Sequence, residues 1–157
     1  MAKKIPFNKP IIIGNELDYI AQSVHSGKIS GNGLFTEKCH WRFEEKYGFK
    51  KCLMTTSCTD ALEMAAILCD ISPGDEIIAP SYTFVSTVNA FILRGARVVF
   101  CDSRSDHPGM NEGLIESLIT KRTKVIIAVH LYGNPCKLKE IKEIKTSRRY
   151  CRFVLRN

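Results

Sequence analysis

The sequence predicts an α/β fold of three layers, in which helices cover both faces of a mostly parallel sheet. From residue 50 onward, short apolar runs alternate four times with helical patterns. The runs are apolar on both faces, which is typical of buried parallel strands. A chain of 157 residues that is 45% hydrophobic can also bury a core of ordinary size.

The residues before this alternation predict an N-terminal helical segment, residues 1–48. Asn15 can cap a first helix, and Gly27 can end it. A glycine-rich loop follows, and Thr36 at its end can cap a second helix. We expect that second helix to stop near Gly48, because glycine tolerates the backbone conformation that ends helices.

The alternating segment, residues 49–145, predicts a partial α/β domain. We expect strands at residues 52–54, 76–79, 97–101 and 124–129. We expect helices at residues 60–69, 83–94, 111–119 and 138–145. In such sheets, ligands bind in the loops beyond the carboxyl ends of the strands. The candidate site loops are therefore residues 55–59, 80–83, 102–110 and 130–136.

The first of these loops, Thr55 to Thr59, contains three threonines, a serine and a cysteine. It leaves a predicted strand and enters a predicted helix, so free N–H groups and hydroxyls converge at the positive end of the helix dipole. The pattern predicts a binding site for a phosphate group. The alternative is a simple N-cap by Ser57 or Thr59, which is the common use of these residues. Neither G-x-G-x-x-G nor G-x-x-x-x-G-K-[ST] is present, which disfavours dinucleotide-binding and P-loop sites.

Two further hypotheses concern side chains near this loop. Cys58 at the start of a helix could be a nucleophile with His130 as its base, which would make the protein a thiol enzyme. Tyr82 and Phe84 lie in the next loop and could stack on an aromatic cofactor. Packing of both rings in the core is the alternative.

Charge and cysteine content narrow the functional classes. The net charge is +7, and residues 137–157 alone carry eight lysines or arginines against two glutamates. The rest of the chain has no basic face, so we expect no nucleic-acid partner. Seven cysteines without a C-x-x-C pair predict reduced thiols and no metal site. The absence of a long apolar run and of a signal peptide predicts a cytoplasmic protein without a membrane span.

Several segments resemble a known enzyme family. They are IPFNKP, SGKISGNGLFTE, SCTDALEMAA, PGDEIIAPSYTFVSTVNAFILRGARVVF and VHLYG. Over residues 5–144 the chain resembles the DegT/DnrJ/EryC1/StrS sugar-nucleotide aminotransferases. The resemblance implies part of the large domain of a fold-type I aminotransferase that uses pyridoxal 5'-phosphate (PLP). In that family glutamate donates its amino group to the cofactor, which passes it to a 4-keto sugar nucleotide.

The resemblance also implies site residues and partners. The loop that holds the cofactor phosphate in the family matches Ser57, Cys58, Thr59 and Asp60, with contacts from the Thr59 hydroxyl and the Asp60 N–H. The aromatic residue that stacks on the pyridine ring matches Phe84. The likeness is greatest to family members that aminate a dTDP-4-keto-6-deoxyhexose for surface polysaccharides such as lipopolysaccharide and enterobacterial common antigen. Family members are homodimers, so the glycine-rich loop is expected to reach the partner's site.

The resemblance ends before residue 146. In the family, a strand resembling E-D-A-A-Q supplies the carboxylate for the pyridine nitrogen, and the Schiff-base lysine follows later. Residues 146–157, TSRRYCRFVLRN, replace that strand, and we interpret them as an aberrant basic tail. We therefore expect the chain to be an amino-terminal fragment that contains no Schiff-base lysine, so we assign no catalytic residue. We expect this fragment to be inactive alone and to have an unpaired sheet edge. A non-catalytic module that binds a phosphate ligand or nucleotide is the other alternative.

Overall fold

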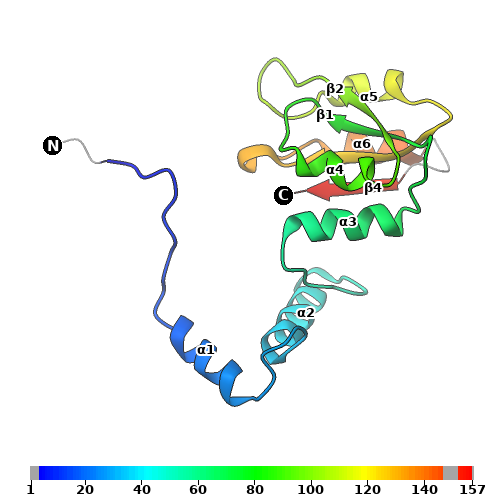
Figure 1. Cartoon of the computed structure of the whole chain (residues 1–157). Helices are drawn as coiled ribbons and strands as arrows, with labels where there is room; N and C mark the ends of the chain where they lie inside the picture. Colours follow the sequence, from blue (N-terminus) through cyan, green and yellow to red (C-terminus); the bar gives the residue numbers. More distant parts are fainter. Residues whose placement is uncertain (1–3, 147–151, 157) are drawn as a thin grey trace. The chain divides into compact units, whose positions relative to one another are not determined.

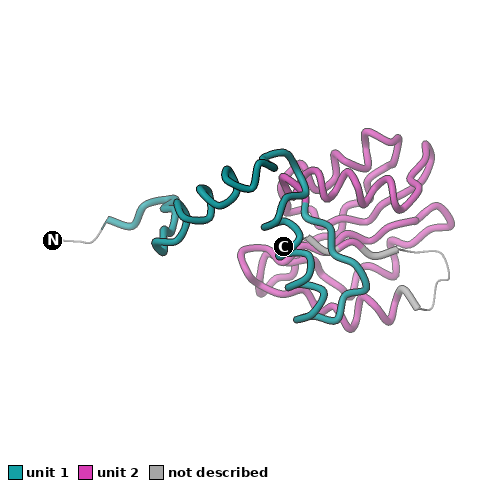
Figure 2. Tube along the Cα trace, turned by 90° about the horizontal axis from the view of Figure 1, so that it is seen from below, with its two compact units in different colours: residues 1–54 teal, residues 55–157 magenta. Residues whose placement is uncertain are grey.

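The computed structural model describes the backbone of residues 4–146 and 152–156. Side chains are described for residues 4–144 and for Val154. Two compact units form, unit 1 from Met1 to Met54 and unit 2 from Thr55 to Asn157 (Figure 2). The sequence placed this boundary a few residues earlier, after residue 48.

The first helix of unit 1, α1 (Glu16–His25), follows Asn15 as predicted. The Asn15 side chain, however, makes no cap hydrogen bond. The Glu16 carboxylate instead accepts hydrogen bonds from the N–H groups of Ile13 (2.7 Å) and Gly14 (2.8 Å). The acidic side chain therefore fixes the approach of the chain to the helix.

The second helix, α2 (Leu34–Tyr47), begins earlier than predicted, with Gly33 as its extended N-cap residue. The prediction that Thr36 caps this helix is wrong, because the chain is already helical there. Its predicted end is confirmed, since Gly48 takes the left-handed conformation at φ 66°. Neither α1 nor α2 contains a buried residue.

Unit 2 is built on a four-stranded sheet in the order β2-β1-β3-β4 (Figure 1). Its strands are β1 (Glu76–Pro80), β2 (Arg97–Cys101), β3 (Thr123–Val129) and β4 (Arg152–Arg156). All three pairings between neighbouring strands are parallel. The predicted parallel sheet is confirmed.

One predicted strand, residues 52–54, is wrong. This segment belongs to unit 1 and has no sheet pairing in the described part of the chain. The N–H groups of Cys52 and Met54 donate instead to Glu44 Oε1 (2.8 Å) and His40 Nε2 (2.9 Å) of α2. Its backbone donors are therefore satisfied by side chains rather than by a neighbouring strand.

The segment that was expected to lack a strand contains one. Within residues 146–157, β4 pairs in parallel with β3, and Val154 lies opposite Ile127. Residues 147–151 and 157 of that segment lie outside the described residues. Val154 packs against the buried cluster on one sheet face, so this part of the basic segment continues the sheet.

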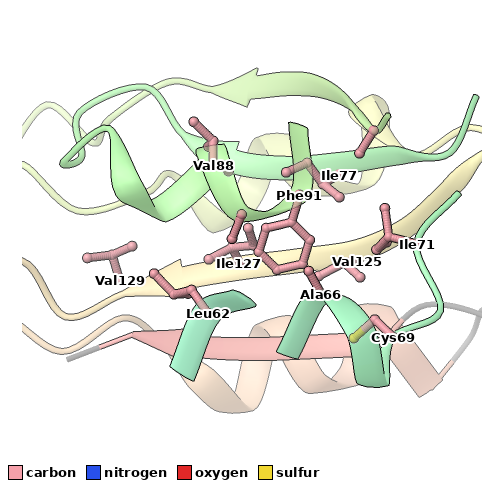
Figure 3. Packing of buried hydrophobic residues seen from close by; sticks show 13 residues of the cluster. Leu62, Ala66, Cys69, Ile71, Ile77, Val88, Phe91, Val125, Ile127 and Val129 are labelled. Carbon is pink, nitrogen blue, oxygen red and sulfur yellow. The ribbon is translucent and has the colours of Figure 1, made fainter. Parts of the chain in front are cut away.

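Helices cover the two faces of the sheet in pairs. They are α3 (Cys58–Leu68), α4 (Ser86–Ile92), α5 (Glu112–Leu118) and α6 (Leu138–Thr146). The first two pack over one face, where Phe91 points toward Ile127 (Figure 3). The last two pack over the opposite face, around Ile78 and Ile126. Alternate residues of the strands thus enter different cores, and the three-layer prediction is confirmed.

No helix in the described ranges is long and apolar enough to cross a membrane.

Candidate functional site

The candidate site lies at the edge of unit 2 where the strands end. The arrowheads of β1 and β4 and the beginning of α3 lie on the same side of the unit in Figure 1. The helix α4, which follows the loop after β1, packs beside α3. The polar loop and the loop that carries the predicted ring therefore lead into neighbouring helices.

The beginning of α3 confirms the N-cap interpretation for Ser57. This residue is extended (φ −151°, ψ 163°), and its hydroxyl accepts a hydrogen bond from the Asp60 N–H at 3.1 Å. The Thr55 hydroxyl donates to the Ser57 carbonyl oxygen at 2.8 Å. These two bonds fix the loop just before the helix begins.

Two backbone donors remain at the same end of α3. The N–H groups of Cys58 and Thr59 have no hydrogen-bond partner among the described residues, and both side chains are exposed. They lie at the positive end of an 11-residue helix, where an anion is favoured. The Ser57 cap and a phosphate site are therefore compatible, because the cap uses the Asp60 N–H group and leaves those of Cys58 and Thr59.

The Asp60 N–H differs from the sequence-based expectation. It already donates to Ser57 Oγ, so it can reach a phosphate only if the serine side chain turns away. The Asp60 carboxylate accepts a hydrogen bond from the Thr56 hydroxyl. That bond, followed by a hydrogen bond of the same carboxylate with the Ser57 side chain, holds the pKa of Asp60 below its usual value. A negative charge therefore lies beside the two open donors.

The rings of the second loop are exposed rather than buried. Phe84 is 66% exposed and Tyr82 is 52% exposed, so the alternative that both pack in the core is wrong. In the same loop, the hydroxyls of Thr83 and Thr87 lie 2.9 Å apart and connect the loop to α4. The exposed Phe84 ring is thus carried on a braced loop.

The fourth loop, residues 130–136, contains two features that the sequence did not indicate. His130 Nδ1 accepts a hydrogen bond from the Cys136 N–H at 3.1 Å, so its ring closes the loop. Tyr132 reaches the neighbouring loop, and its hydroxyl lies 3.3 Å from that of Tyr82. The signal that could have found this pair is the position of both tyrosines two or three residues after adjacent strands.

The proposed base His130 is therefore engaged elsewhere. Its Nδ1 atom accepts a backbone hydrogen bond, and no hydrogen bond joins it to Cys58 within residues 4–146. A thiol enzyme needs its base within hydrogen-bond reach of the nucleophile. The geometry gives no support to that arrangement.

A buried carboxylate also supports the site loops. The Glu112 side chain is almost fully buried and accepts hydrogen bonds from the Lys137 N–H (2.9 Å) and from Arg104 Nη1 (3.3 Å). Burial acts to raise the pKa of Glu112, but these hydrogen bonds outweigh it, and the pKa lies below the usual value. Arg104 also holds Asp106 through two contacts of 2.8 Å, which lowers the pKa of Asp106 to about 2.

Two lysines near the ends of elements form ion pairs. Lys124 lies near the beginning of β3, and its Nζ atom pairs with Asp75 at 3.0 Å. That end of the strand is opposite to the candidate site. Lys137 Nζ pairs with Glu140 at 3.2 Å. In the described part of the chain, no group of three or more metal-ligating side chains comes together.

Comparison with known proteins assigns the chain to a family. The model of the DegT/DnrJ/EryC1/StrS aminotransferase family matches residues 10–150. The chain belongs to this family. Its resemblance, inferred from short segments, is thereby confirmed over nearly the whole chain, and the family uses PLP to transfer amino groups to sugars carried by nucleotides.

Individual relatives agree with the family. The chain is 36% identical to the GDP-perosamine synthase of Escherichia coli O157:H7 over 146 residues, which is 93% of this chain and 40% of that protein. It is 34% identical to the GDP-perosamine synthase of Caulobacter vibrioides over 90% of this chain and 38% of that protein. The chain thus spans about two fifths of the length of these curated relatives.

Solved structures give the same result for the fold. The Streptococcus pneumoniae protein Spr1654, described as a sugar aminotransferase, matches in its PLP form with a TM-score of 0.86 and 30% identity. This match covers 96% of the present chain and 38% of that one. The predicted fold, part of a fold-type I aminotransferase, is confirmed.

The described residues fit the phosphate and the ring of the family cofactor. The two open N–H groups and the exposed hydroxyl of Thr59 are donors suited to a phosphate ester. The exposed Phe84 offers an apolar face to an aromatic ring. The Asp60 carboxylate is the one element of this loop that opposes an anion.

Proposed function

We propose that this chain forms the cofactor-phosphate-binding part of a PLP-dependent sugar-nucleotide aminotransferase. The observation that carries the proposal is the pair of open N–H groups of Cys58 and Thr59 at the beginning of α3, in a chain of this family. Ser57 holds the loop, the Thr59 hydroxyl adds a donor, and Phe84 lies over the cofactor ring. When bound, PLP acts as the electron sink for amino-group transfer.

We propose glutamate as the amino donor and a 4-keto sugar nucleotide as the acceptor. Its sequence segments resemble those of dTDP-4-oxo-6-deoxy-D-glucose transaminase, so a dTDP-4-keto-6-deoxyhexose is the first candidate. Two relatives named GDP-perosamine synthase favour a GDP-linked sugar as the second candidate. The product would enter surface polysaccharide synthesis in the cytoplasm. Amination of one nucleotide sugar and not of the other by the complete protein decides between them.

We propose a homodimer as the working form. Neither helix of unit 1 contains a buried residue, although large apolar side chains such as Leu17, Ile20 and Trp41 are present and exposed. Apolar surface of this extent favours association. Sedimentation that gives only the mass of one chain at micromolar concentration contradicts this proposal.

The cofactor site can be tested by removing a single N–H group. Cys58 is the first residue of α3, and Ser57 before it is extended, so a proline at position 58 suits both residues. Cys58→Pro therefore deletes one open donor without breaking the helix. Cys58→Ala is the matched control, because it removes the thiol and keeps the N–H group.

The readout is the dissociation constant of PLP, and of inorganic phosphate as a competitor, measured by calorimetry. Loss of one charge-assisted hydrogen bond, about 1.5–3 kcal/mol, weakens binding of both about 10- to 150-fold in Cys58→Pro. Cys58→Ala should bind like the original chain. If the proline variant and the original chain bind PLP and phosphate with equal affinity, the proposed phosphate site is wrong. An equal loss in both variants would indicate a contribution of the thiol instead, because both substitutions remove it.

A further inference from the structure

Two exposed tyrosines form a pair at the ends of neighbouring strands. Tyr82 follows β1 and Tyr132 follows β3, and these strands are paired in the sheet. Their hydroxyl oxygens lie 3.3 Å apart, and their rings meet edge to face at 6.4 Å between centroids. Even so, Tyr132 is 80% exposed. Large aromatic rings at the surface of a site mark a contact with a partner or ligand.

Hydrogen bonds brace the loop that carries Tyr132. Tyr132 itself is left-handed (φ 51°, ψ 32°), which is an uncommon conformation for a residue other than glycine. The Asn134 side chain donates to the Leu131 carbonyl at 3.2 Å, and the His130 ring closes the loop on Cys136. Strained residues on braced loops are concentrated at ligand sites, because the surrounding bonds hold them in place before the ligand binds.

The chemistry of the pair defines what it can recognise. One of the two hydroxyl hydrogens lies between the oxygens, so the other hydroxyl can donate outward. The hydrogen bond with Tyr82 raises the pKa of Tyr132, so Tyr132 keeps its hydrogen at neutral pH. Two rings set edge to face also offer an apolar face next to that donor. A sugar ring, with C–H groups on one face and hydroxyls at its rim, has the complementary pattern.

We propose that Tyr82 and Tyr132 form a recognition element for the sugar of the nucleotide-sugar substrate, packing on its C–H face and donating one hydrogen bond to a sugar oxygen. This inference rests on the proposed function, and it names the part of the substrate that this edge of the sheet binds. The two tyrosines contact the sugar and not the base, so the same pair can serve a dTDP-linked or a GDP-linked substrate.

The test compares nucleotide sugars with their free nucleotides. The probes are dTDP-glucose against dTDP and GDP-mannose against GDP, titrated into the full chain by calorimetry. Tyr132→Phe removes one hydroxyl, and Tyr132→Ala also removes the ring. Tyr19→Phe is the control, because Tyr19 is an exposed tyrosine of unit 1. Saturation-transfer NMR from tyrosine ring protons to sugar protons gives a second readout, which reports contact and not stability.

We expect the original chain and Tyr19→Phe to bind each nucleotide sugar more tightly than its nucleotide. Tyr132→Phe should reduce that ratio about 2- to 10-fold and leave free-nucleotide binding unchanged. Tyr132→Ala should lower the ratio further than Tyr132→Phe and weaken the saturation transfer, which then comes from Tyr82 alone. Equal binding of nucleotide sugar and nucleotide by the original chain, or an unchanged ratio in Tyr132→Phe, overturns the inference.

The two proposals fail in different ways. If PLP binds as described above and the sugar ratio does not respond to Tyr132, only the sugar inference is lost. If the sugar ratio responds and PLP does not bind, the aminotransferase proposal is lost, and a sugar-nucleotide-binding module takes its place.

Discussion

Replacement of Glu112 by glutamine should destabilise unit 2 and loosen two site loops. The carboxylate receives the Lys137 N–H at 2.9 Å and Arg104 Nη1 at 3.3 Å. A hydrogen bond to a charged group contributes about 1.5–3 kcal/mol. Glutamine can still accept from the backbone N–H, and Arg104 keeps its contacts with Asp106. We therefore expect the free energy of unfolding to fall by about 1.5–3 kcal/mol, which is the value of one such bond.

The pH dependence of the unfolding free energy distinguishes the loss of this charged hydrogen bond from poor packing of the glutamine side chain. The folded pKa of Glu112 lies below the usual value, so its ionised form stabilises the fold above the unfolded pKa, about 4.3. That contribution is lost as the pH falls through the lower, folded pKa. Glutamine does not titrate, so the stability gap between the original chain and the variant should narrow toward zero below about pH 4.

The assay is urea unfolding followed by far-ultraviolet circular dichroism, near neutral pH and again in acid. The single tryptophan lies at position 41 in unit 1, so circular dichroism is the better probe of the helices and sheet of unit 2. Hydrogen exchange at the Lys137 amide gives a local measurement of the same bond. Glu116→Gln, an exposed site on α5, should change stability by less than about 0.5 kcal/mol. A gap between Glu112→Gln and the original chain that is independent of pH would refute the reasoning.

Two further substitutions test the packing of unit 2. Phe91 is fully buried between α3 and the sheet, so Phe91→Ala should lower the free energy of unfolding in urea by about 3–5 kcal/mol. Phe100→Ala, at a 54% exposed position, should lower it far less. Equal losses would contradict the core assignment. A Cβ atom at Gly95 would lie 2.8 Å from a proline ring, whereas one at Gly74 would meet nothing within 4 Å, and both have positive φ. Gly95→Ala should therefore lower the thermal midpoint more than Gly74→Ala, and the reverse order would count against the contact.

The sequence predicted those parts of the fold that depend on local pattern. The apolar runs at β1 and β3 are recognisable because both faces of each strand are buried. The run at β2 is apolar too, although that strand is only partly buried. Asn111 lies at a predicted helix boundary, and its side chain does cap α5 by accepting from the Gly113 N–H. These features follow from residues within one turn or one strand of each other.

Errors occurred where a strand depends on a distant partner. Residues 52–54 have the composition of a strand, yet their donors bond to side chains of α2. The segment that contains β4 was interpreted from its charge, although Phe153, Val154 and Leu155 form a short apolar run. Its register beside Val125 to Val129 is a property of the sheet, and a composition shift does not report it.

The candidate site was predicted only in part for the same reason. The Ser57 cap and the donors at α3 follow from a local sequence pattern. The Tyr82–Tyr132 contact and the Glu112 carboxylate join residues 50 and 25 positions away in the sequence. Single-sequence reasoning can place each residue at the correct edge of the sheet. It cannot say which of them touch.

The electrostatics of the polar loop set a condition on any anion bound there. Its open donors are backbone N–H groups, which do not titrate, so the protein's contribution to anion binding from these two groups does not change with pH. The Asp60 carboxylate opposes that attraction, and the Thr56 hydroxyl holds it in its charged form. Because Asp60 is exposed, solvent screens this repulsion. We therefore expect an anion to bind most tightly while the Asp60 carboxylate accepts the hydrogen bond from Thr56. In that arrangement the carboxylate does not compete for the two open N–H groups, which can then bind the anion.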